Sequence, residues 1–166
     1  MAHELKRLED KNLATAITLA MHYRDLNQPD EAESICRDVL EVAPDNVDAL
    51  RTLGLAMTDR FSSRWMSLFE DACAAFEKLP THYDRAYYVG IAWERYAKAQ
   101  LEAGRAHNAV HAFEEAIARF EEAARHAAND DPAPILHFNR CVRALTTPEL
   151  AAAAQVPQQP TYELGD

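Results

Sequence analysis

Apolar residues recur along this chain at the three- and four-residue spacings that place them on one face of a helix. Each of three triplets has a spacing of four and then three residues: Ala32, Cys36 and Val39; Ala72, Phe76 and Leu79; Ala109, Phe113 and Ala116. An apolar residue followed by a small one precedes each triplet: Leu19-Ala20, Leu53-Gly54 and Val89-Gly90, the first two 34 residues apart. This imperfect repeat predicts three helix pairs, in which the small residue lets the second helix approach closely and the units bury their apolar faces by stacking.

Turn and capping residues divide the chain at the same places. They predict repeats at about 10–46, 47–80 and 81–128, within one helical domain over 1–154. Pro29 is expected to begin a helix, because proline is favoured in the first turn. We expect Asn46 and Thr81 to be N-caps and Gly104 to end a helix. Phe61-Ser-Ser63 is expected to be a short connection. A seventh helix over about 133–146 and a short one through Ala154 form a predicted cap over 133–154, and the tail at 155–166 is expected to be extended or disordered.

The first unit resembles a tetratricopeptide repeat (TPR). Leu19, Ala20, Tyr23, Ala32 and Pro44 match the positions at which that family has Leu, Gly or Ala, Tyr, Ala and a closing Pro, whereas Cys36 and Val39 depart but stay apolar. The second and third units carry about two extra helical turns before the alanine of the second helix. The resemblance covers about residues 10–128 and extends to small bacterial TPR proteins. It implies an all-α fold, a right-handed α-solenoid of three TPR-like helix pairs, the second and third lengthened, with a C-terminal capping helix.

Composition and charge reduce the classes of partner that the chain is expected to bind. The 166 residues carry a formal net charge of −10, which disfavours nucleic acid and anionic membrane surfaces, and no apolar run is long enough to span a membrane. The charged start of the chain lacks an apolar signal core, so a cytoplasmic location is expected.

No catalytic or cofactor motif is found, so we expect no enzyme activity, no cofactor and no metal site. The three cysteines form no C-x-x-C pair and are expected to be small buried hydrophobes. His107 and His111 share a helix face at zinc-ligand spacing but are expected to face solvent. His137 and Cys141 have the same spacing among apolar neighbours, which indicates packing.

The TPR resemblance implies a concave groove lined by the first helix of each pair. By position, the groove residues would be Ile17, Met21 and Arg24; Arg51, Leu55 and Thr58; and Tyr87, Ile91, Glu94 and Lys98. This mixture of apolar and basic side chains suits a peptide or helix with apolar anchors and an acidic residue. The alternative is that the seventh helix or the tail fills the groove.

The leading functional hypothesis is therefore a non-catalytic scaffold that binds a protein or peptide partner. Two alternatives stay open. The chain resembles small acidic TPR chaperones of secretion systems in size and charge, and apolar residues at a stack end could instead pair two copies into a homodimer.

Overall fold

The computed structural model describes residues 3–155, and within 62–66 it describes the backbone alone. The described chain is all helical, which confirms the predicted all-α class. Its elements are a short 3-10 turn (Asp10–Asn12), α1 (Leu13–Asp25), α2 (Pro29–Val42), α3 (Val47–Thr58), α4 (Phe61–Glu77), α5 (His82–Glu102), α6 (Ala106–His126), α7 (Ala133–Leu145) and α8 (Pro148–Ala154). The expectation for 156–166 lies outside the described residues.

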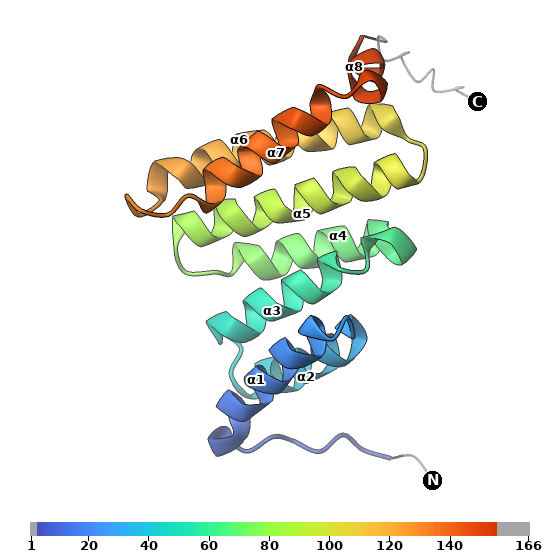
Figure 1. Cartoon of the computed structure of the whole chain (residues 1–166). Helices are drawn as coiled ribbons and strands as arrows, with labels where there is room; N and C mark the ends of the chain where they lie inside the picture. The colour runs from blue at the N-terminus through green and yellow to red at the C-terminus, as the bar shows by residue number, and fades with distance from the viewer. Residues whose placement is uncertain (1–2, 156–166) are drawn as a thin grey trace, which may run out of the picture.

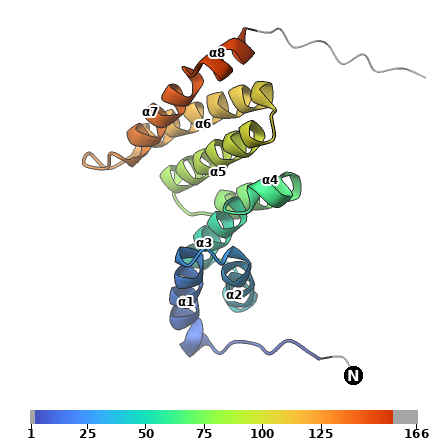
Figure 2. The same ribbon diagram turned by 45° about the vertical axis from the view of Figure 1, so that its right-hand side comes forward.

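The helices follow one another along the molecule in the order of the sequence, from α1 and α2 at one end to α8 at the other (Figures 1 and 2). Each helix from α1 to α7 packs against the next one in the chain, and α1 contacts α3 as α3 contacts α5. The most extensive packing joins α5 and α6, the two longest helices, and α8 packs mainly on α6. Of the described helices, none is both long and apolar enough to cross a membrane.

The predicted capping residues act at three helix ends. Asn46 accepts a hydrogen bond from the backbone of Ala49 at 2.9 Å, and Thr81 accepts one from Asp84 at 2.9 Å, so both satisfy amides that a helix start leaves unpaired. Gly104 has a positive φ of 73° just after α5, a conformation that glycine adopts without strain. The prediction of a connection at Phe61-Ser-Ser63 is wrong. Phe61 is buried and begins α4, and the link between α3 and α4 consists of residues 59 and 60 alone.

Small residues permit close helix packing where the pattern predicts it in the second pair. A Cβ built on Gly54 would lie 2.6 Å from Cζ of Phe76, far inside normal contact distance. In the third pair, a Cβ on Gly90 would meet Phe120 at 2.8 Å. Phe120 lies one heptad beyond Phe113, the large residue of the third triplet, because α5 and α6 are both long and their facing positions are further apart in sequence.

Aromatic side chains join the middle of the molecule into its core. The ring of Phe69 on α4 lies 4.6 Å from that of Trp93 and 4.8 Å from that of Tyr96, both on α5. Phe76 stacks on Tyr88 at 5.4 Å. These contacts, of which only that of Phe69 with Trp93 is edge to face, hold the second and third pairs together mainly by burying aromatic area.

Candidate functional site

One hollow of the molecule is lined by the odd-numbered helices. It has a volume of about 370 Å³ and is bordered by Arg24 of α1, Leu55 of α3, Tyr87, Tyr88, Ile91, Glu94, Arg95 and Lys98 of α5, and His137 and Arg140 of α7. We call it the basic groove, because its cationic side chains outnumber its single carboxylate. The predicted groove was expected on the first helix of each pair, and this hollow lies on those helices.

Six of the ten predicted groove residues line this hollow: Arg24, Leu55, Tyr87, Ile91, Glu94 and Lys98. The other four do not border it. Ile17 is half-buried and Met21 half-exposed on α1. Thr58 is buried, and Arg51 donates to Asp48 at 2.9 Å with its guanidinium 5.5 Å above the ring centre of Tyr88. Whether any of these residues binds a partner stays a prediction.

Glu94 forms the floor of the groove at the contact between α5 and α7. Its carboxylate is almost fully buried. It accepts hydrogen bonds from Arg140 at 2.5 and 2.8 Å and from His137 at 2.7 Å. It also forms an ion pair with Lys98 at 2.9 Å. Burial alone would raise the pKa of Glu94, but the hydrogen bonds from His137, Arg140 and Lys98 outweigh it and hold the pKa well below its usual value. Glu94 is therefore a fixed anion that ties α7 to α5.

The seventh helix was expected, as one alternative, to fill the groove; it borders the hollow without filling it. It covers Glu94 and supplies Arg140 as a wall, yet the hollow beside it remains open. The side chains of Arg140 and Lys98 are each about half exposed, at 52% and 49%. Both cationic side chains therefore stay partly accessible at the groove after pairing with Glu94.

A second charged network closes the side of the groove between α1, α3 and α5. Arg24 donates from Nε to Asp59 at 2.7 Å, and Arg95 also pairs with Asp59. Arg95 further donates to the hydroxyl of Thr58 at 2.6 Å, while that hydroxyl donates to the carbonyl of Leu55 at 2.7 Å. Burial lowers the pKa of Arg95, although Asp59 opposes this shift, and an arginine stays protonated in either case. Asp59 therefore fixes two guanidinium groups at the rim.

The apolar part of the groove comes from Leu55, Tyr87 and Ile91. Ile91 is buried in the core, and Tyr87 is half-buried with its ring 5.5 Å from that of His137, edge to face. Leu55 is partly buried and packs against two clusters of buried apolar residues, one that includes Phe76 and one that includes Phe113. An aromatic and two aliphatic side chains next to four cations give a surface that can hold an apolar anchor beside an acidic group.

Sequence reasoning missed Tyr88, Arg95, His137 and Arg140. Arg95 was detectable, because it lies four residues after Ile91 and shares that residue's face of the helix. His137 and Arg140 also share a face, at a spacing of three. The apolar residues of this helix indicate a cap, and the spacing of His137 to Cys141 among apolar neighbours indicates packing, so neither pattern points to a groove.

The two histidines at zinc-ligand spacing do not both face solvent. His111 is exposed, but His107 is half-buried, and its Nδ1 lies 3.5 Å from the carbonyl oxygen of Ala153 in α8. The expectation failed for His107 because α8 folds back on the start of α6. Within residues 3–155, no group of three His, Cys, Asp or Glu side chains is placed to hold a metal ion.

The three cysteines were expected to be small buried hydrophobes, and this is confirmed for two of them. Cys36 and Cys141 are fully buried, Cys73 is half-buried, and all are free thiols. Burial raises the pKa of each thiol to about 12, so the reactive thiolate is scarce at neutral pH.

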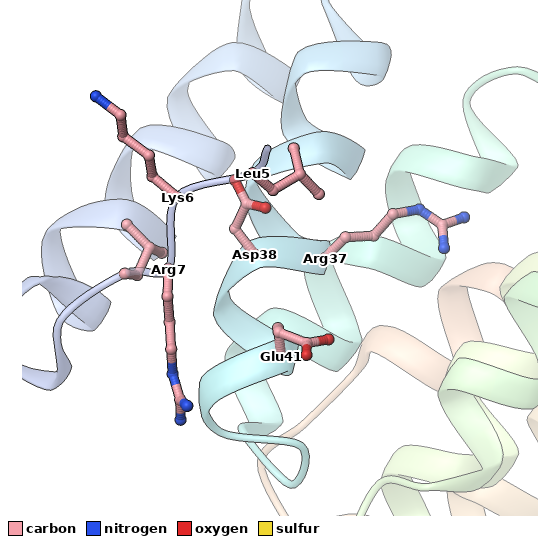
Figure 3. Close-up of a pocket in the computed structure, with 7 residues that line it drawn as sticks. Leu5, Lys6, Arg7, Arg37, Asp38 and Glu41 are labelled. Atoms are coloured by element: carbon pink, nitrogen blue, oxygen red, sulfur yellow. The ribbon is translucent and has the colours of Figure 1, made fainter. Parts of the chain in front are cut away.

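A second hollow, of about 380 Å³, lies between the N-terminal segment and α2, and it is less suited to binding (Figure 3). Its lining comes from Leu5, Lys6, Arg7 and Leu8 of the segment and from Arg37, Asp38 and Glu41 of α2. Leu5 is 95% exposed, and the charged ends of Lys6 and Arg37 point apart. Its charges do not converge on one point, in contrast to the basic groove.

Comparison of the chain with protein-family models and with curated proteins finds no match to either.

Proposed function

We propose that this chain is a non-catalytic protein-interaction module that binds a segment of a partner protein in the basic groove. The observation that carries this proposal is the continuity of the groove across α1, α3, α5 and α7, with apolar and cationic side chains side by side. A surface made by several helices can hold an extended or helical segment along its length. Such a module works by shape and charge rather than by bond-making chemistry.

Charge narrows the kind of segment. Arg24, Arg95, Lys98 and Arg140 face two carboxylates, Glu94 and Asp59, so the groove keeps an excess of positive charge in a chain whose net charge is −10. Opposite charges across an interface favour encounter and register. The preferred segment therefore carries an acidic side chain next to an aromatic or aliphatic anchor.

We also infer that α1–α2, α3–α4 and α5–α6 are TPR-like units of a right-handed solenoid, with α7 and α8 as its cap. The contact of Gly54 with Phe76 supports this inference, since a small residue against a large one is how the repeat pattern brings paired helices together. Contacts between α1 and α3, and between α3 and α5, support a shared surface of first helices.

The test of function compares affinity capture by wild type, Lys98→Gln and Lys78→Gln from a lysate of the source organism, read by mass spectrometry. Lys98 borders the groove, whereas the exposed Lys78 follows α4 and does not. Support requires a protein that wild type and Lys78→Gln retain, that Lys98→Gln loses, and that binds the purified chain directly. Equal retention by both variants would rule out the groove as the binding surface.

Self-association is a second candidate because α7 leaves apolar residues uncovered. Ile135, Leu136 and Val142 are 56%, 61% and 37% exposed at the end of the stack. If this face pairs two copies, Leu136→Glu should convert a dimer to a monomer in light scattering. A monomeric mass of the wild-type chain at high concentration would remove this candidate.

A further inference from the structure

We propose that the basic groove binds the chain's own C-terminal segment, residues 156–166, so that a partner must displace it. This inference rests on the groove of the proposed function and names its internal ligand. In the docked form, Glu163 and Asp166 lie against the exposed groups of Lys98 and Arg140, and Tyr162 and Leu164 lie on the apolar wall.

Charge complementarity is the first argument. The segment reads Val-Pro-Gln-Gln-Pro-Thr-Tyr-Glu-Leu-Gly-Asp and contains two carboxylates, one aromatic and one leucine, with no lysine or arginine. The groove offers the matching set: four cationic side chains, between 25% and 52% exposed, beside Leu55 and Tyr87. An acidic residue next to an apolar anchor is the ligand chemistry that this groove favours.

Reach is the second argument. The path from Arg140 to the end of α7, across the two-residue turn and along α8 to Gln155, is at most about 29 Å. The eleven residues after Gln155 span up to about 36 Å when extended, at about 3.3 Å for each residue. The segment is therefore long enough to enter the groove of the same molecule.

The consequence is competition with partner binding. A tethered segment has an effective concentration on the order of 1 mM. A tail that binds its groove with a dissociation constant of about 100 µM would then weaken the apparent affinity for a partner about tenfold. A weak contact between the segment and the groove is thus enough to exclude partners that bind the groove only weakly.

Zero-length cross-linking with a carbodiimide tests this docking on the full chain. The reagent joins a carboxylate to an amine only where the two touch, and the chain has four lysines: Lys6, Lys11, Lys78 and Lys98. We expect mass spectrometry to find Lys98 joined to Glu163 or Asp166 in the monomer, with a yield that falls at least about threefold in 0.5 M salt. The exposed pair of Lys11 and Glu9, 2.6 Å apart, verifies that the reaction works.

Two variants and an isotope mixture sharpen the result. Glu163→Gln/Asp166→Asn should lower the yield of the cross-link between Lys98 and the C-terminal segment and leave the Lys11–Glu9 product unchanged. Absence of a cross-link between Lys98 and the C-terminal segment while Lys11 reacts with Glu9, or equal yields of cross-links from that segment to Lys98 and to Lys78, would overturn the proposal. So would products that join heavy to light chains in a mixture of 15N-labelled and unlabelled protein, because they place the segment on a second copy. None of these outcomes alters the capture experiment, in which a partner retained by Lys78→Gln and lost by Lys98→Gln supports the proposed function whether or not the segment docks.

Discussion

The carboxylate of Glu94 on α5 receives two hydrogen bonds from the guanidinium of Arg140 on α7 and so fastens the last long helix to the stack. Glu94→Gln removes the charge that both Arg140 and Lys98 pair with. We expect a loss of about 1–2 kcal/mol of stability in urea denaturation at pH 7, less than for a fully buried pair because both cations are half exposed and regain hydration. Glu114→Gln, at an exposed position of α6, serves as the control and should change stability little.

The same carboxylate predicts a pH dependence. The folded-state pKa of Glu94 is depressed below its ordinary value of 4.5, so its stabilisation is present above that value and is lost as the pH falls through and below it. The stability difference between wild type and Glu94→Gln should therefore shrink from pH 5 to pH 3, when urea unfolding is measured at each pH. A difference that stays constant over this range would contradict the assigned role of the charge.

The packing of Gly54 against Phe76 predicts overpacking when a methyl group is added. Gly54→Ala should cost about 1–3 kcal/mol, because the new Cβ would collide with a ring held in the core. The collision should be relieved by a smaller partner. In a double-mutant cycle, Phe76→Leu should cost less in the Gly54→Ala background than in wild type. Additive effects would show that the two side chains do not constrain one another.

Much of the fold could be predicted from the sequence because its signals are local. Helix spacing, Asn46 and Thr81 as caps, and Gly104 as a terminator depend only on neighbouring residues. The register of the third pair could not be predicted, because Phe113 and Phe120 both fit the same spacing. Only the facing helix selects Phe120 as the neighbour of Gly90.

The groove divides in the same way. The TPR resemblance implied that Tyr87, Ile91, Glu94 and Lys98 share one face of α5, and all four border the hollow. The contribution of α7 depends on how a terminal helix packs back on the stack, which no local spacing encodes. The sequence therefore does not indicate His137 and Arg140, whose role follows from their hydrogen bonds to Glu94 in the structure.

The helix caps provide a stability prediction with a matched control. Asn46→Ala and Thr81→Ala should each cost about 1 kcal/mol in thermal or urea unfolding, since each removes an acceptor for a helix-start amide. Thr147 precedes α8, but its hydroxyl donates to the carbonyl of Ala144 and makes no cap bond. Thr147→Ala should cost less than either, and an equal cost would argue against the cap bonds as the cause.

Thiol burial predicts slow alkylation. With thiol pKa values raised to about 12 by burial, roughly one thiol in ten thousand is ionised at pH 8. Iodoacetamide should therefore modify the folded chain far more slowly than the urea-unfolded chain, with the half-buried Cys73 first. Peptide mass spectrometry over time would give the order. Early modification of Cys36 would mean that the first helix pair opens readily.

The pairing of Gly90 with Phe120 in the third helix pair shows how the length of the helices in one pair can differ from that in another. The helices α5 and α6 have 21 residues each, against 13 and 14 for α1 and α2, so each is longer by about one heptad. Seven residues are nearly two full turns. A heptad added to both partners therefore lengthens a pair by about 10 Å while leaving its buried faces almost unrotated. Phe113 and Ala97 fill the added stretch of core. The breadth of the stack can thus be set pair by pair, independently of how many pairs it contains.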